Sequence, residues 1–211
     1  MRIIVFVMFI SFQVFGQEIV VSDSLQKTNP IVFYEFYGGI GGGTNGSMFF
    51  AGANLNYEFE KSNLITLRYT GFTSFEREYL YIGYVPFPIF TREESVLEYA
   101  FLYGKRYTFD NKSLSISAGI SINDRTFYKY SEELNYYNKF DDINIGLPVE
   151  FNIKWFKAEK KRFRAYYGLI PIGKKRVSFG RSIGFKIIGN FSKTTYLGIG
   201  LTYGFGWHKK Y

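Results

Sequence analysis

The stretch INIGLPVEFNIKW, residues 143–155, decides the fold because its apolar and polar residues alternate without interruption. Every odd-numbered position holds Ile, Leu, Val, Phe or Trp, whereas the even-numbered positions hold Asn, Gly, Pro, Glu or Lys. Successive side chains of a β-strand point to opposite faces, so this period of two predicts a strand with one apolar face. An amphipathic helix needs apolar residues both three and four positions apart, and this stretch has none three positions apart.

Strands are predicted along most of the rest of the chain. The further strand candidates before residue 160 are 31–43, 49–59, 65–70, 97–104 and 113–122. Three more follow at about 163–172, 177–188 and 194–207. Because turn signals separate these segments and no helical pattern lies between them, the sequence predicts an all-β protein built as an antiparallel up-and-down meander.

The composition excludes several kinds of chemistry. The chain has no Cys and one His among 211 residues, so thiolate metal sites, disulfides and multi-histidine metal centres are excluded. We predict neither a cofactor nor an enzymatic activity. His208 falls after the last strand candidate, and we expect it to be a solvated residue of a C-terminal tail, 208–211.

The first 16 residues predict export. Arg2 precedes an apolar run from Ile3 to Phe15, and Gly16 offers a cleavage site before Gln17. This is the plan of a secretory signal peptide, and the run is too short to span a bilayer as a helix. We therefore expect a signal peptide at 1–16 and a periplasmic N-terminal segment at 17–30.

The polar faces of the strands distinguish two architectures that share the alternation. A soluble sandwich or barrel exposes its polar face to water and usually carries many Lys, Glu and Asp there. Here the polar faces are mostly Gly, Ser, Thr and Asn, which suit the crowded inside of a narrow barrel. The apolar faces end in aromatic residues, as the lipid-facing strands of membrane barrels do. The sequence therefore favours a transmembrane β-barrel over 31–207.

The lengths of the links orient the barrel. Short links are expected at 60–63, 110–112 and 157–162, and long ones at 77–93 and 125–142. Membrane barrels have short periplasmic turns and longer external loops, so the long links and the turn at 44–47 are assigned to the outside. Both long links are rich in aromatic residues that could contact a surface ligand: Tyr79, Tyr81, Tyr84, Phe87, Phe90, Phe127, Tyr128, Tyr130, Tyr136 and Tyr137.

The strand candidates add up to nine. Membrane barrels of one bacterial chain have an even number. We predict eight strands, with one candidate belonging to a long external loop. Ten strands, with an additional strand in 78–90, are the alternative.

The end of the chain resembles the C-terminal signal of bacterial outer-membrane barrels, on the residues Gly200, Tyr203 and Phe205. In that family, aromatic residues follow a glycine three and five positions later, near the end of the chain. The sequence departs from the family at Gly198, where a polar residue is usual, and in the six residues after Phe205. The resemblance, to small outer-membrane barrels of the OmpA/OmpX-like type, implies recognition by the barrel-assembly machinery and a location in the bacterial outer membrane.

The register of the strands places six ionisable residues inside the barrel. They are Glu35, Glu58, Arg68, Glu98, Glu150 and Lys154, with Lys186 added if 177–188 is a strand. Charges in a narrow interior need partners or water, so we expect a salt-bridge network that fills it. This predicts a non-enzymatic barrel that serves envelope structure or surface interaction. The alternative is a small diffusion channel for ions or small solutes.

The expected partners follow from this location. They are outer-membrane lipid, lipopolysaccharide, the assembly machinery and an unidentified surface ligand. Nucleic acid is not expected, because the charge is spread over turns, loops and tail without a continuous basic stripe.

Overall fold

The computed structural model describes residues 31–44, 46–60, 62–131, 136–156, 161–165, 170–177 and 179–209. The predicted signal peptide, 1–16, and the N-terminal segment, 17–30, lie outside the described residues. The described part of the chain contains no helix that is long and apolar enough to cross a membrane.

The described chain forms ten β-strands. They are β1 (Ile31–Gly43), β2 (Gly46–Phe59), β3 (Asn63–Ile82), β4 (Val85–Thr108), β5 (Lys112–Ser131), β6 (Tyr136–Phe156), β7 (Lys161–Ala165), β8 (Ile170–Val177), β9 (Phe179–Phe191) and β10 (Tyr196–Trp207).

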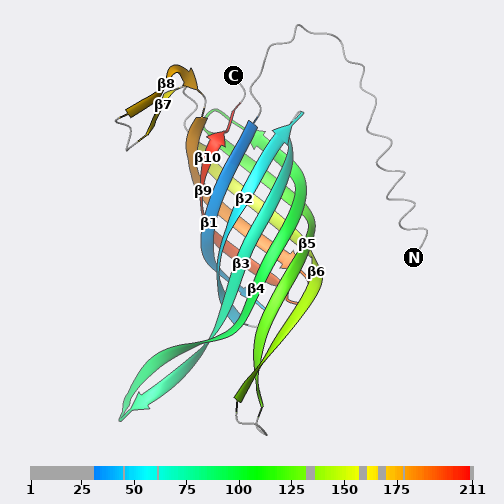
Figure 1. Ribbon diagram of the computed structural model, residues 1–211, viewed down its shortest axis with the longest axis vertical. Helices are drawn as coiled ribbons and strands as arrows, with labels where there is room; N and C mark the ends of the chain where they lie inside the picture. Colours follow the sequence, from blue (N-terminus) through cyan, green and yellow to red (C-terminus); the bar gives the residue numbers. More distant parts are fainter. Residues whose placement is uncertain are drawn as a thin grey trace, which may run out of the picture.

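Eight of these strands close into an antiparallel barrel in the order β1-β10-β9-β6-β5-β4-β3-β2 (Figure 1). Closure is made by the first and last strands, which pair from Phe33 with Gly206 to Gly43 with Tyr196. The predicted eight-stranded up-and-down barrel is thereby confirmed. The alternative of a separate strand in 78–90 is wrong, because that segment consists of the ends of β3 and β4 and the turn between them.

The two long links that the sequence assigns to the outside are strands rather than loops. β3 to β6 contain 20, 24, 20 and 21 residues, about twice the 9–11 that a tilted strand needs to cross a bilayer. β3 and β4 stay paired as far as Ile82 and Val85, and β5 and β6 as far as Ser131 and Tyr136. Two ribbons therefore project beyond the barrel, at the end opposite the C-terminus (Figure 1).

The segment between β6 and β9 differs most from the prediction. Instead of a short turn at 157–162 and a barrel strand at 163–172, β7 and β8 pair with each other in a separate two-stranded sheet. This β7–β8 hairpin connects to the barrel at the end where β6 stops and β9 starts, which is also the end of the C-terminus (Figure 1). The prediction assigned one strand candidate to a long loop on the side of the ribbons, whereas this hairpin lies at the opposite end of the barrel (Figure 1). Consecutive basic residues, such as 160–162 and 174–176, leave the segment without the apolar face that a barrel strand requires.

The apolar faces of the barrel strands point outward. Aliphatic side chains in the middle of the strands are largely exposed, with Ile145 at 78%, Ile120 at 63% and Leu201 at 58%. Aromatic side chains occupy the outward positions near the strand ends at the terminal side, among them Tyr57, Tyr103, Trp155 and Trp207. This arrangement, an apolar belt with aromatic residues along its border, is that of membrane barrels.

Candidate functional site in the barrel interior

The centre of the barrel holds a network of six charged side chains that come from five strands. The six members are Glu35 (β1), Arg68 (β3), Glu98 (β4), Glu150 and Lys154 (β6) and Lys186 (β9), and each is at most 2% exposed. Three carboxylates therefore meet three cations. Five of these residues are among the six that the sequence placed in the lumen, and the sixth, Glu58, lies nearer the terminal end of the barrel.

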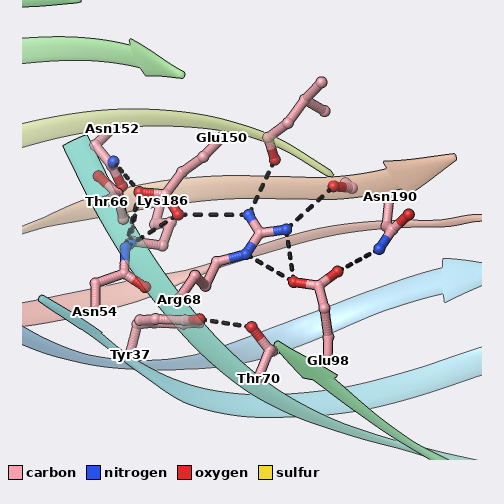
Figure 2. Close-up of polar contacts among 12 residues, drawn as sticks. Tyr37, Asn54, Thr66, Arg68, Thr70, Glu98, Glu150, Asn152, Lys186 and Asn190 are labelled. Carbon is pink, nitrogen blue, oxygen red and sulfur yellow. Dashed lines mark hydrogen bonds and ion pairs between the residues drawn. The ribbon is translucent and has the colours of Figure 1, made fainter. Parts of the chain in front are cut away.

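Arg68 links two of the carboxylates (Figure 2). Its Nε donates to Glu98 Oε1 at 2.8 Å, and its Nη1 donates to Glu150 Oε2 at 3.4 Å. The remaining donors reach the carbonyl oxygens of Val149, at 3.1 Å from Nη1, and Gly189, at 3.4 Å from Nη2. The guanidinium thus connects four strands, β3, β4, β6 and β9, through side-chain and backbone contacts.

Lys186 extends the network on the other side of Glu150. Its Nζ lies 2.9 Å from Glu150 Oε1 and 3.1 Å from Glu35 Oε2, and Glu35 also pairs with Lys154. The chain of contacts therefore alternates in sign from Glu98 through Arg68, Glu150, Lys186 and Glu35 to Lys154. Alternation of this kind compensates charges that have lost their water.

Neutral side chains donate further hydrogen bonds to the carboxylates. Asn54 Nδ2 donates to both oxygens of Glu150 at 3.0 and 3.1 Å, and Asn152 Nδ2 donates to Glu150 Oε1 at 2.6 Å (Figure 2). Asn190 and Tyr196 both donate to Glu98. The two central carboxylates each accept several hydrogen bonds, as buried carboxylates must to remain charged.

A second ion pair lies at the terminal end of the interior. Arg106 Nη1 donates to Glu58 Oε2 at 2.6 Å, and Arg106 Nη2 donates to the carbonyl oxygen of His208 at 2.9 Å. The Arg106 guanidinium also lies over the ring of Phe33, 5.0 Å from its centroid. These contacts hold the residue that follows β10 in the mouth of the barrel.

The prediction of a solvated His208 is wrong. The residue is 3% exposed, and its ring lies between those of Phe33, at 5.0 Å, and Phe156, at 5.6 Å between centroids. Burial, together with the charges of Arg106 and Lys154, lowers the pKa of His208 to about 3. The ring is therefore neutral at neutral pH and packs as an aromatic group.

A third ion pair, between Arg125 and Glu94, lies toward the opposite end of the barrel. The Arg125 guanidinium also covers the ring of Phe127 at 4.5 Å from its centroid. Among the described residues, all five buried carboxylates therefore have a basic partner.

Apolar side chains fill the interior on both sides of the central network, which the sequence did not predict. Toward the ribbons lies a cluster of Tyr37, Met48, Phe50, Phe72, Val96, Ile188 and Tyr196. Toward the terminal end lies a smaller cluster of Ile31, Phe33 and Leu64. The interior is thus layered, with charged groups between two apolar clusters.

Glycines make room for the larger of these clusters. A Cβ added to Gly198 would lie 2.5 Å from the Phe50 ring, and one added to Gly39 would lie 2.7 Å from it. The interior positions of these glycines therefore accept the Phe50 ring. This gives a local reason for Gly198, where the C-terminal signal of the family usually has a polar residue.

Arg106 and Glu94 were missing from the predicted lumen residues, although both follow the register. Lys186, which the sequence added on the condition that 177–188 is a strand, lies in β9 and is buried. On β4, Arg106 lies eight positions after Glu98 and Glu94 lies four positions before it, so all three side chains belong to the same face of the strand. Extending the period of two to both ends of the strand would have found them. Between these charges the same face holds Val96, Ala100, Leu102 and Gly104, which hid the pattern.

The aromatic residues proposed as a surface site lie on the projecting ribbons. Tyr79, Tyr81, Tyr84 and Phe87 are 49–102% exposed on the β3–β4 ribbon, and Tyr128 is 38% exposed on β5. Phe127 stacks on Phe140, with centroids 5.5 Å apart. For Phe90, Tyr130, Tyr136 and Tyr137 the structure describes the strand but not the side chains. The ribbons present these rings as extended strands, without a pocket among the described residues.

The three residues of the C-terminal resemblance lie together on β10. Tyr203 is 45% exposed on the outer face, and Phe205 lies near the rings of Tyr34, Phe36 and Phe179 at 5.9–6.3 Å. Gly200 takes the opposite face, where an added Cβ would lie 2.3 Å from the carbonyl oxygen of Gly38. Their part in assembly remains a prediction.

The chain is thus a closed, eight-stranded antiparallel barrel with a polar centre and an apolar exterior, the architecture of the small outer-membrane barrels. No family model matches the chain, and no curated protein matches its sequence.

Three solved structures are similar in outline. The N-terminal β-barrel domain of Pseudomonas aeruginosa OprF aligns with a TM-score of 0.45 at 9% identity, covering 84% of this chain and 98% of that one. Neisserial surface protein A gives 0.47 at 8%, covering 85% and 98%. Ail, the attachment invasion locus protein of Yersinia pestis, solved with the heparin analogue sucrose octasulfate, gives 0.34 at 10%, covering 83% and 97%. The fold assignment itself rests on the strand pairing of this chain.

Proposed function

We propose that this chain is a non-enzymatic barrel of the bacterial outer membrane with a filled interior, which serves envelope structure or surface interaction. The supporting observation is the layered interior. A neutral set of three carboxylates and three cations lies between two apolar clusters, so the centre offers no continuous polar path.

The outer surface supports the membrane location. Its strands expose Ile, Leu and Phe side chains all round the barrel, an apolar area far larger than soluble monomers expose. In lipid the same surface is favourable. Lipid and lipopolysaccharide are accordingly the proposed surroundings of the belt, with the assembly machinery as a partner through Gly200, Tyr203 and Phe205.

The absence of catalysis is part of the proposal. Every buried carboxylate of the described chain is held by Arg or Lys, and such pairing opposes the free acid or base that a hydrolytic mechanism requires. The aromatic ribbons, which project from the barrel, are the proposed contact surface for a partner.

Two measurements test the proposal. Protein refolded into planar bilayers should give no steady conductance steps, because the interior is filled. A shift in gel mobility between unboiled and boiled samples should show that the same preparation contains closed barrel. Ohmic steps from heat-modifiable protein would instead establish the diffusion channel, and extraction from cell membranes without detergent would contradict the membrane location.

A further inference from the structure

The segment 157–178 carries nearly all of the net charge of the chain. It contains eight Lys or Arg residues and one Glu, a net charge of +7, whereas the whole chain has 26 basic and 18 acidic residues, a net charge of +8. The other 189 residues are therefore almost neutral. Six of the eight basic residues lie on β7 and β8, which are not part of the barrel wall. A charge concentrated in this way indicates an anionic ligand.

The fold holds this charge in one place. β7 and β8 pair antiparallel, with Arg162 opposite Arg176 and Lys161 opposite Val177. Like charges at directly opposed positions of a two-stranded sheet destabilise it. An anion that binds across the two strands would remove this repulsion, so the register itself favours an anionic partner.

The hairpin is attached to the barrel beside the aromatic border of the apolar belt. β6, which leads to the hairpin, ends at Phe156, and the preceding Trp155 is 36% exposed. β10 ends on the same side of the barrel at Trp207, which is 37% exposed. In membrane barrels, aromatic residues at this position mark the level of the lipid headgroups. A basic hairpin that starts at this level is at the height of the phosphates.

We propose that the β7–β8 hairpin binds the headgroups of anionic phospholipids in the leaflet at the terminal end of the barrel. The inference rests on the proposed membrane function and adds a lipid preference to it. Each Lys or Arg side chain near an anionic membrane surface contributes attraction equivalent to about a fivefold preference, so a hairpin with this charge would enrich anionic lipid around itself. A soluble anionic polymer fits the charge but not the position beside the aromatic border.

The two tryptophans of the chain provide the test. Trp155 and Trp207 are the only Trp residues in the sequence, and both lie at the terminal end of the barrel. Bromine atoms on lipid acyl chains quench tryptophan fluorescence on contact. The full-length mature protein would be refolded into vesicles that contain equal fractions of phosphatidylglycerol and phosphatidylcholine, with either one or the other brominated.

Two matched variants separate the hairpin from general surface charge. The hairpin variant, K174Q/K175Q/R176Q, removes three charges from β8. The control variant, K105Q/K112Q/R181Q, removes three exposed charges from barrel strands at the same end. All samples are tested for heat-modifiable mobility, so that only closed barrels are compared.

The expected result is a preference of about fivefold for brominated phosphatidylglycerol in the wild type and in the control variant, the equivalent of one basic group near the surface. The hairpin variant should lose the preference, and roughly 1 M NaCl should suppress it through screening. Equal quenching by both lipids in the wild type, or a preference that the hairpin variant retains, would overturn the inference. Absence of heat-modifiable protein and of quenching by either lipid would contradict the proposed function instead.

Discussion

Arg68 contacts two carboxylates and two backbone carbonyls at the centre of the barrel. Replacing it with Met removes the only described basic partner of Glu98 and one of the partners of Glu150. Breaking a buried ion pair from one side typically costs about 3–5 kcal/mol, because a charge remains without its counter-ion. We expect Arg68→Met to lower the free energy of unfolding by that amount, measured by urea unfolding of the barrel in lipid vesicles.

The control for this prediction is Lys105→Met, at an exposed position of β4. Surface substitutions usually change stability by less than about 0.5 kcal/mol. If Arg68→Met and Lys105→Met had the same effect, the central network would not be a source of stability.

The buried ring of His208 predicts a dependence on pH. Its pKa is about 3 in the folded chain and 6.5 in the unfolded chain, so above pH 6.5 both states are neutral and the ring has no effect. As the pH falls below 6.5, the unfolded chain binds a proton that the folded chain excludes. The free energy of unfolding then decreases by up to about 1.4 kcal/mol per pH unit until the folded pKa is reached.

His208→Phe isolates this contribution because it keeps a ring between Phe33 and Phe156 and removes the proton. Urea midpoints would be compared at about pH 7 and about pH 4. The variant should gain stability relative to the wild type on acidification. Parallel pH profiles for the two proteins would show that the ring is protonated in the folded state as well.

The contact between Gly198 and Phe50 predicts a rescue. A side chain at position 198 would meet the Phe50 ring, since an added Cβ already lies 2.5 Å from it. Gly198→Leu should therefore destabilise the barrel by about 1–3 kcal/mol through overpacking. In a Phe50→Ala background, Gly198→Leu should cost less than it does alone, because the ring that it would meet is gone. A cost that is the same or larger in that background would contradict the contact.

The β3–β4 ribbon shows at the scale of an element why proline is tolerated in a strand. Gly83, with φ of 66°, and Tyr84 form a two-residue turn between Ile82 and Val85. In such a hairpin the hydrogen-bonded pairs are 82–85, 80–87 and 78–89, so the N–H positions of residues 86 and 88 point away from β3. These two positions are prolines, which therefore remove donors from the open edge and leave the pairing with β3 intact.

The same register predicts that the ribbon can be shortened. Deletion of 79–88, with Asn-Gly joining Glu78 to Ile89, keeps a hydrogen-bonded pair next to a favourable turn. Because this segment pairs only with itself among the described residues, we expect the stability of the barrel to change by less than about 0.5 kcal/mol. Heat-modifiable mobility and a urea midpoint measure the result, and loss of the closed barrel would show that the ribbon is needed for folding.

The sequence could predict the elements whose two faces differ in polarity. The period of two in 143–155 is sufficient to identify β6 and its outward face. It failed for the ribbons, because both faces of 79–87 are apolar or aromatic and no alternation remains. It also failed for β7 and β8, whose strands have no apolar face and which pair only with each other.

At the scale of the whole molecule, the charges that matter for stability are enclosed. Salt screens exposed charges strongly and buried pairs much less. We therefore expect the free energy of unfolding to change by less than about 0.5 kcal/mol between roughly 0.05 and 1 M NaCl, measured by urea titration at each salt concentration. A steep loss of stability with salt would mean that water and ions enter the network.

The pairing inside the barrel was less predictable than the barrel itself. Alternation identifies which residues face inward, but it does not give their heights, and these decide that Arg68 meets Glu98 and Glu150 rather than Glu58. The apolar clusters were missed for a related reason. Phe33, Phe50 and Phe72 take inward positions that a simple rule of polar inside and apolar outside assigns to polar residues.

The closure of the barrel by β1 and β10 has a consequence for biogenesis. β10, which seals the barrel against β1, follows the other seven barrel strands in the chain, so the barrel segment cannot form a ring before β10 has been made. Until then the outward aliphatic faces of the other seven strands do not belong to a closed barrel. A chain that ends before residue 196 would be left with two open edges, and in the cell it should be degraded or aggregate before it reaches a bilayer.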